Sequence, residues 1–210
     1  MTSPPPYAPS PAVRRGPFVV LEGVSGIGKS TLARLLADRL DAAALHTLPG
    51  PHATWAHTAS TDLEPLPQFA FYLSGLLHAS DLVHRQLASS PVIADRYASS
   101  VIACHAAVHR LDTDDVTHLL APFTPYLAAP DHTFYLRCSP GALRERMATK
   151  KDLKADDTAL FGIPGRLERL VANFDAVADA DTTAIRLDTD GRSPDQLADT
   201  VLDHLEQARA

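Results

Sequence analysis

The chain has 210 residues, of which 45% are apolar and 21% are charged. This length supports one substantial hydrophobic core and lies at the upper end for a single domain. A formal net charge of −6 argues against the broad basic surface that nucleic-acid-binding proteins use to neutralise phosphates. We therefore expect a small-molecule partner and no nucleic acid.

The two cysteines, Cys104 and Cys138, have no C-x-x-C spacing and are too few for a disulfide framework, which favours a reducing compartment. The apolar runs all fall short of the ~20 residues that cross a bilayer, and the N-terminus lacks the charged-then-apolar order of a secretory signal. We expect a cytoplasmic protein without a membrane role.

Prolines dominate the first sixteen residues, which read MTSPPPYAPSPAVRRG. Proline removes backbone donors, and this stretch offers little that could pack. The sequence therefore predicts a disordered proline-rich tail over residues 1–16 and one domain over 17–210.

From Phe18 onward, short apolar runs alternate with helical patterns, which is typical of βα units and a parallel sheet covered on both faces. Apolar residues at three-to-four spacing predict helices over 29–40 and 68–89. Further helices should begin where a serine precedes a proline, at Ser139 and at Ser193, and Gln196 completes a capping box with Ser193. Five runs are predicted as strands: 18–22, 42–46, 92–95, 133–137 and 183–187.

The run FVVLE is followed by a phosphate-binding motif, G-x4-G-K-S-T, and at once by an amphipathic helix. Glycines let backbone N–H groups converge on a phosphate, and the helix N-terminus adds its positive dipole end. Lys29 is expected to bridge the β and γ phosphates of ATP, and the Ser30 hydroxyl to ligate Mg²⁺. The residues expected to hold ATP are Gly23, Val24, Ser25, Gly26, Ile27, Gly28, Lys29, Ser30 and Thr31.

A second polar site follows the predicted strand at 92–95, which ends in Asp95 and is followed by Arg96. The carboxyl ends of parallel strands converge on one crevice, so Asp95 should face Lys29. Asp95 could hold Mg²⁺ or accept a proton, and Arg96 could bind a phosphate. The alternative is that Asp95 merely caps the next helix while Arg96 lies on the surface.

These motifs resemble the thymidylate kinase family and its nucleotide and nucleoside kinase relatives over most of the chain from Phe18. The resemblance rests on VLEGxxGxGKST at the loop, Phe71-Tyr72, the D-R-Y run that ends at Tyr97, and the L-R-E-R-M run over 143–147. It implies a P-loop kinase fold, a three-layer αβα sandwich with a five-stranded parallel sheet and a helical lid over roughly 144–165.

The same resemblance implies roles for individual residues. An aromatic at Phe71 or Tyr72 stacks on the acceptor base, Arg96 and Tyr97 lie at the acceptor, and lid cations clamp the transferred phosphoryl group. Arg144 and Arg146 are expected as catalytic lid residues; Lys150 is expected at the substrate, and Lys151 and Lys154 are further lid candidates. A homodimer is also implied.

Three places in the sequence depart from the patterns of these kinases. Ser25 stands where thymidylate kinases usually carry an acidic residue, and the run over 46–50 replaces their Arg-Glu-Pro-Gly. Gly75 stands at the base-reading arginine, and Leu48 where deoxynucleoside kinases would place a glutamate base. We therefore expect a divergent member rather than a true thymidylate kinase.

Three functions remain open at this stage. The leading one is an ATP-dependent kinase for a nucleoside monophosphate or a nucleoside. The alternatives are a kinase for a non-nucleotide alcohol such as a sugar acid, and an ATP-binding regulatory protein without an acceptor. The aromatics at Phe71 and Tyr72 could also be core residues, and His105 with His109 is interpreted as a surface pair rather than a metal site.

Overall fold

A computed structural model describes residues 13–149 and 160–208 of the chain. Its centre is one five-stranded sheet, in which every neighbouring pair of strands is parallel and the order is β2-β3-β1-β4-β5. The strands are β1 (Phe18–Glu22), β2 (Ala43–His46), β3 (Val92–Asp95), β4 (His132–Arg137) and β5 (Ala184–Asp188).

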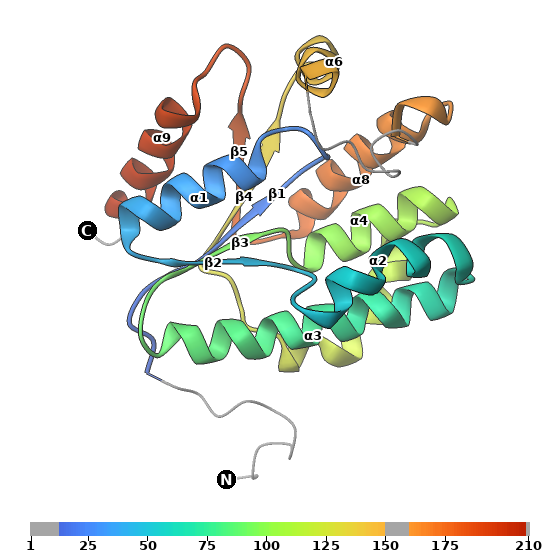
Figure 1. Ribbon diagram of the computed structural model, residues 1–210, viewed down its shortest axis with the longest axis horizontal. Coiled ribbons are helices and arrows are strands. Elements are labelled where there is room, and N and C mark those ends of the chain that lie inside the picture. Colours follow the sequence, from blue (N-terminus) through green and yellow to red (C-terminus); the bar gives the residue numbers. More distant parts are fainter. Residues whose placement is uncertain (1–12, 150–159, 209–210) are drawn as a thin grey trace, which may run out of the picture.

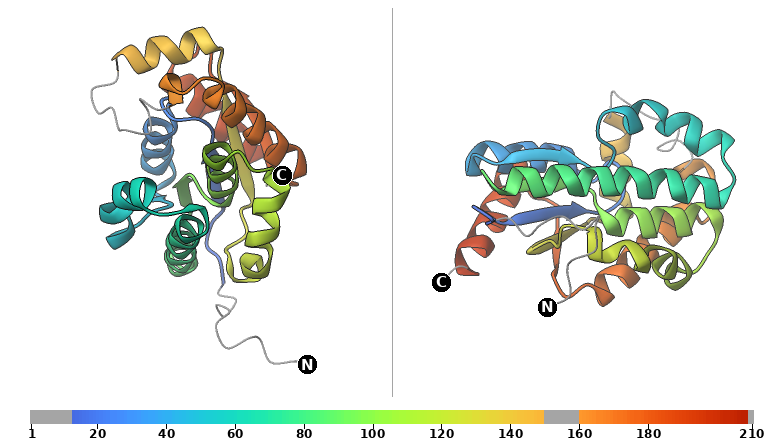
Figure 2. Two further views of the ribbon diagram at one scale, coloured as in Figure 1. Left: turned by 90° about the vertical axis from the view of Figure 1, so that its right-hand side faces the viewer. Right: turned by 90° about the horizontal axis from the view of Figure 1, so that it is seen from below.

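Helices cover both faces of this sheet, with α1 and α9 on one side and α3 on the other (Figure 1). Figure 2 shows the same layers from two further directions. The helices are α1 (Lys29–Leu40), α2 (Pro51–Asp62), α3 (Pro65–Leu87), α4 (Ala98–His109), α5 (Thr113–Leu120), the 3₁₀ turn η1 (Ala121–Tyr126), α6 (Pro140–Thr149), α8 (Arg166–Ala180) and α9 (Pro194–Gln207).

The central strand β1 is fully buried and supplies two cores. Val19 and Leu21 pack with α1 and α9, whereas Phe18 and Val20 pack with α3 and α4. A strand buried on both faces reads as a continuous apolar run, which is why FVVL shows no alternation. The α/β three-layer fold predicted from the sequence is confirmed.

The predicted element boundaries agree closely with the structure. The strand at 18–22, the strand at 92–95 and the helix at 29–40 are reproduced without change, and the other three strands shift by one residue at one or both ends. The helix predicted over 68–89 runs as α3, three residues earlier at its start and two at its end. The capping box of Ser193 and Gln196 is present, and Ser139 Oγ accepts from Ala142 N at 3.2 Å.

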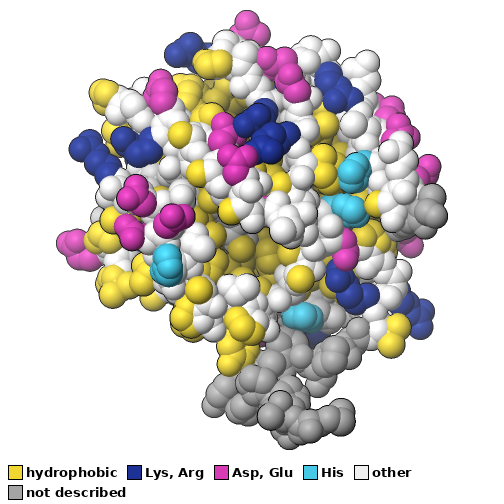
Figure 3. All heavy atoms as spheres, turned by 180° about the vertical axis from the view of Figure 1, so that it is seen from behind, with side chains coloured by type: hydrophobic (Ala, Val, Ile, Leu, Met, Phe, Trp, Pro, Cys, Tyr) yellow, Lys and Arg dark blue, Asp and Glu magenta, His cyan; other side chains and the backbone are white. Residues whose placement is uncertain are grey.

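The beginning of the described chain is tied to the domain. Arg14 forms an ion pair with Asp131 at 2.7 Å, Phe18 N donates to the same carboxylate, and Arg15 N donates to Leu87 O. Among residues 13–149 and 160–208, none of the helices combines the length and apolar character needed to cross a membrane. On the face shown in Figure 3, Lys and Arg side chains are interleaved with Asp and Glu.

Candidate active site

A cleft of about 910 Å³ opens where β1, β2 and β3 end, a size typical of small-molecule sites. The strand register brings these ends together, because Asp95 pairs with Leu21 of β1 and with His46 of β2. Side chains from α1, α2, α3, α4, α6 and α8 complete the walls. The cleft therefore lies where a parallel sheet gathers its ligand-binding groups.

The phosphate-binding loop lies along one side of the cleft. Its lining residues are Ser25, Gly26, Gly28, Lys29, Ser30 and Thr31. Val24 and Ile27 instead point into the core behind the loop, where they are buried. All nine residues predicted to hold ATP thus form one loop and the first turn of α1, with two of them anchoring it from behind.

Lys29 is buried, and its ammonium donates to Gly23 O and Val24 O, both at 2.8 Å. Burial lowers the pKa of Lys29 to about 7, with the charge of Arg96 acting in the same direction and Asp95 and Glu22 opposing it. The two carbonyls hold the ammonium inside the loop. A phosphate placed there would replace them as partner and would favour the charged amine.

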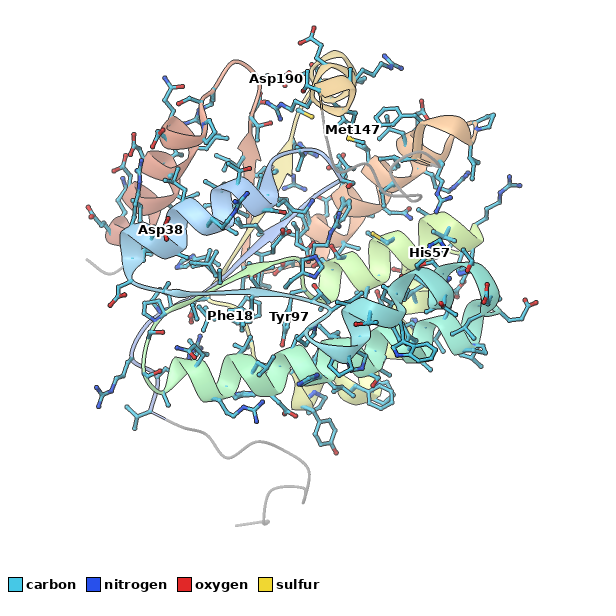
Figure 4. The ribbon with its side chains drawn as sticks, viewed as in Figure 1. Phe18, Asp38, His57, Tyr97, Met147 and Asp190 are labelled. Atoms are coloured by element: carbon cyan, nitrogen blue, oxygen red, sulfur yellow. The ribbon has the colours of Figure 1, made fainter. Side chains whose placement is uncertain are left out.

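One glycine of the loop is favoured by its backbone conformation. Gly26 has φ +82°, and a Cβ at this position would lie 2.2 Å from Met147 Sδ. Met147 belongs to α6, which Figure 4 shows above the loop. The positive φ therefore favours glycine here, and the close approach of Met147 packs α6 directly on the loop.

Ser30 and Asp95 meet across the cleft, with Ser30 Oγ donating to Asp95 Oδ2. The second carboxylate oxygen, Asp95 Oδ1, is buried and has no hydrogen-bond partner among the described residues. A hydroxyl and a carboxylate in direct contact suit Mg²⁺, which typically takes one or two protein oxygens and completes its coordination shell with phosphate oxygens and water. The residues present therefore fit MgATP.

Arg96 follows Asp95 and has φ +74°, a left-handed conformation that is uncommon for a non-glycine residue. Its Nη1 donates to Gly23 O at 3.3 Å and to Ser100 Oγ at 3.0 Å, and the side chain lines the cleft. Asp95 does not cap α4 through its side chain, since that helix begins after Tyr97. The interpretation of Asp95 as a mere helix cap is wrong, and so is the surface position for Arg96.

The wall opposite the phosphate-binding loop is made by α3 and α4 and is uncharged. Gln68 Nε2 donates to the carbonyls of Ala59 and Ser60, which turns its Oε1 toward His109 Nε2 at 2.7 Å. Burial lowers the pKa of His105 to about 4, with the charge of His109 adding to the effect, so its imidazole is neutral near pH 7. The side chains of α3 and α4 thus offer neutral hydrogen-bonding groups. Arg166 of α8 also lines the cleft, and its charge adds to burial in lowering the pKa of His109.

His105 is 5% exposed and lines the cleft, so the expected surface pair of histidines is wrong for this residue. No cluster of three or more His, Cys, Asp or Glu side chains that could hold a metal occurs in the described ranges. His105 therefore contributes a neutral ring to the wall.

Of the two arginines predicted for the lid, only one lines the cleft. Arg146 lines the cleft and donates to Ile27 O at 3.1 Å and to Thr189 O at 2.8 Å, which joins α6 to the phosphate-binding loop. Arg144 is exposed on α6 and does not line the cleft. Lys150, Lys151 and Lys154 lie outside the described residues.

The aromatic residues predicted to bind substrate also separate. Tyr72 lines the cleft, and its hydroxyl lies 2.7 Å from Ser60 Oγ. Phe71 contacts His52 and Tyr72 without lining the cleft. Tyr97 is buried against Phe18 beneath the sheet, with ring centroids 5.1 Å apart (Figure 4).

Comparisons with known proteins now bear on this geometry. A family model described as thymidylate kinase matches residues 21–192. The chain belongs to the thymidylate kinase family. As a member, it is an ATP-dependent phosphotransferase of the nucleotide kinase class.

Individual relatives agree with the family model. The chain is 29% identical to a probable thymidylate kinase of Natronomonas pharaonis over 163 residues, which covers 73% of this chain and 83% of the relative. It is 26% identical over 193 residues to a probable thymidylate kinase of Saccharolobus solfataricus, covering 83% and 88%. The solved thymidylate kinase of Candida albicans superposes with a TM-score of 0.76 over 94% of each chain at 18% identity, which shows the shared fold.

Two positions at which the sequence departs from its kinase relatives, Gly75 and Leu48, meet in one packing contact. A Cβ at Gly75 would lie 2.5 Å from Leu48 Cδ2 and 3.5 Å from the His52 ring. Leu48 therefore occupies the space in which a side chain at position 75 would begin. The small residue on α3 and the apolar residue after β2 complement each other, so a long arginine at 75 requires Leu48 to move.

Several residues of this site were not predicted from the sequence. Thr47, Gln68, Ser100 and His105 all line the cleft, and Glu22 is fully buried beside it. Their signals were polar residues inside otherwise apolar runs, such as Glu22 at the end of FVVLE. Such a residue needs a partner when buried, and the identity of that partner depends on the tertiary fold.

Proposed function

We propose that this protein transfers the γ-phosphoryl group of MgATP to the phosphate of a nucleoside monophosphate. The observation that carries the proposal is the contact of Ser30 with Asp95 beside Lys29, with one buried carboxylate oxygen left without a partner among the described residues. Lys29 and the loop amides would bind the β and γ phosphates, and Ser30 with Asp95 would hold Mg²⁺, which neutralises charge on the phosphates when bound.

The acceptor is assigned to the opposite half of the cleft. Arg96 offers a fork of donors suited to the acceptor phosphate, and the neutral wall of Gln68, Tyr72 and His105 suits a nucleobase. The match to the thymidylate kinase family model supports a nucleotide over a sugar acid as acceptor. The presence of Arg96 in the same cleft as the phosphate-binding loop supports a kinase over an ATP-binding regulatory protein.

Catalysis would then depend on positioning and charge, because phosphoryl transfer requires little covalent chemistry from the protein. Lys29 and Arg96 both donate to the same carbonyl, Gly23 O, so the phosphates that they bind would lie close to each other. Arg146 would add positive charge from α6, which also limits the access of water to the loop.

A coupled assay for ADP release tests the proposal against a panel of ribo- and deoxyribonucleoside monophosphates, the matching nucleosides and sugar acids. We expect turnover with at least one monophosphate and little with the sugar acids. The variant Asp95→Asn keeps the shape of the side chain and should lower kcat by about 100-fold, since metal-ion charge stabilisation is worth several kcal/mol. Measured ATP binding without turnover on any acceptor would contradict the proposal.

The finer assignments belong to the same proposal. The same panel of monophosphates identifies the preferred base. Because Gly75 replaces the family arginine, we expect that dTMP is not the preferred acceptor. A homodimer and a cytoplasmic location stay predictions; size-exclusion chromatography with light scattering measures the former.

A further inference from the structure

Glu22 ends the central strand β1 and has no exposed surface, although it is a carboxylate. A buried carboxylate is costly unless donors surround it. Three donors do so here: Tyr97 N at 2.8 Å and Ser100 N at 3.1 Å reach Oε1, and Ser100 Oγ donates to Oε2. Burial raises the pKa of Glu22, while these hydrogen bonds and the charge of Arg96 oppose the rise.

The donors come from the beginning of α4, whose first backbone N–H groups lack partners within the helix. Within the described chain, the N-cap residue Tyr97 provides no side-chain cap, and Glu22 accepts from Tyr97 N and Ser100 N in its place. The carboxylate also meets the positive end of the helix dipole. A strand residue 75 positions earlier in the chain therefore caps α4.

Arg96 lies between β3 and this capped helix, and its φ of +74° is a strained conformation that persists only where the surrounding structure imposes it. Arg96 N donates to Leu21 O at 3.0 Å on one side, and Glu22 fixes the next residue on the other. The side chain is held as well, because Ser100 Oγ accepts from Arg96 Nη1 and donates to Glu22. Glu22 is thus linked to Arg96 in two ways, through the backbone of Tyr97 and through the hydroxyl of Ser100.

We propose that Glu22 is a positioning residue that presents Arg96 to the phosphate of the acceptor, through the hydroxyl of Ser100 and the capped end of α4. The assignment rests on the proposed function, since it takes Arg96 as the acceptor-phosphate contact. It adds a residue that touches neither substrate, and it joins the strand that begins the ATP loop to the arginine on the acceptor side.

The test compares Glu22→Gln with Thr133→Val by steady-state kinetics and thermal melting. The Thr133 hydroxyl lies 2.7 Å from Thr183 Oγ1 and is also buried, but it lies on β4 before the strand reaches the cleft. We expect Glu22→Gln to raise the KM of the acceptor monophosphate about tenfold or more, since a hydrogen bond to a charged group is worth that factor. The KM of ATP should stay within about twofold.

A second measurement separates positioning from general destabilisation. The nucleoside that corresponds to the accepted monophosphate lacks the phosphate, so its affinity as a competitive ligand should be equal in the wild type and in Glu22→Gln. Thr133→Val should lower the melting temperature and leave both KM values unchanged. If Glu22→Gln does not fold, Ser100→Ala removes the hydroxyl link while keeping the carboxylate, and it should shift the acceptor KM in the same direction.

Three results would overturn the inference. Equal rises in the KM of ATP and of the acceptor would place the action of Glu22 on the ATP loop. A lower melting temperature with both KM values unchanged would show that Glu22 has a purely structural role. Equal losses of nucleoside and monophosphate affinity would show that Glu22 does not act on the acceptor phosphate. If the wild type phosphorylates no monophosphate, the proposed function fails together with this inference.

Discussion

The two halves of the cleft are built in different ways. The proposed ATP half is formed mainly by one continuous segment, from Gly23 to Thr31, which is joined by Asp95 and Arg146. The acceptor half is assembled from α2, α3, α4 and α8, and its lining residues are far apart in the sequence. Local geometry therefore fixes the first half, whereas tertiary packing fixes the second. Substitutions should accordingly act on ATP in one half and on acceptor choice in the other.

The largest effect is expected from Lys29→Met in the ATP half. The variant removes the charge that the loop carbonyls hold, so kcat should fall by 10³-fold or more, on the order of other phosphate-clamping cations. ATP affinity, measured by isothermal titration calorimetry, should fall as well. Arg39→Met on the same helix is the control, because its ion pairs with Asp195 and Asp199 lie at the surface, away from the cleft. An unchanged kcat in Lys29→Met would contradict the assignment of this half of the cleft to ATP.

The next effect comes from pH. Burial, chiefly, lowers the pKa of Lys29 to about 7, so the free enzyme loses the ammonium as pH rises through that value. In the proposed function ATP binds the charged amine of Lys29, so binding should take up a proton above pH 7, and affinity should fall up to about tenfold per pH unit. Calorimetry in two buffers of different ionisation enthalpy measures the proton uptake. The affinity for a nucleoside in the acceptor half should not change over the same pH range. A matching change in nucleoside affinity would show that a group other than Lys29 causes the pH dependence.

A smaller effect is expected at the contact of Gly75 with Leu48 in the acceptor half. Gly75→Ala should raise the acceptor KM several-fold, because the new Cβ would lie 2.5 Å from Leu48 Cδ2 and would force Leu48 to move. Gly75→Ala combined with Leu48→Ala relieves the clash, and the helix then gains about 1 kcal/mol from replacing glycine. A double-mutant cycle on melting free energy and acceptor KM measures the coupling. Additive effects would show that the two positions are independent.

The smallest effect is expected from Tyr97→Phe. The sequence places Tyr97 at the acceptor, whereas the structure packs its ring against Phe18 in the core. Removing the hydroxyl should leave both KM values unchanged and alter the melting temperature by only a few degrees, since its loss is worth about 1 kcal/mol. A selective rise in the acceptor KM would return Tyr97 to the substrate site.

The ATP half and most of the sheet were predictable from the sequence. The motif from Gly23 to Ser30 combines glycines, a lysine and a hydroxyl at fixed spacing, and Asp95 follows a buried strand whose end position is set by the sheet. Both inferences need only local geometry and the rule that parallel strands end together. This is why the contact between Ser30 and Asp95 could be anticipated from residues 65 positions apart.

The acceptor half was less predictable for a physical reason. Helical spacing places Phe71 and Tyr72 on neighbouring faces of α3, but only packing against α2 decides that Tyr72 lines the cleft. The helix α2 itself was missed, because PHATWAHTASTD has a weak amphipathic pattern and buries only Ala59. His105 became a cleft residue only through the partners that α3 brings to it. Sequence patterns predict which residues share a face of a helix, whereas the packing of neighbouring helices decides which face lines the cleft.

The burial of Glu22 also has a consequence for folding. FVVL is apolar on both faces, so a slip of β1 along its neighbours would keep every apolar side chain in an apolar environment. The carboxylate is different, because its three donors at the start of α4 are met in one alignment only. A misaligned β1 would bury an uncompensated charge at the centre of the sheet. Glu22 therefore favours the native register of the central strand over a shifted one, whether or not a ligand is bound.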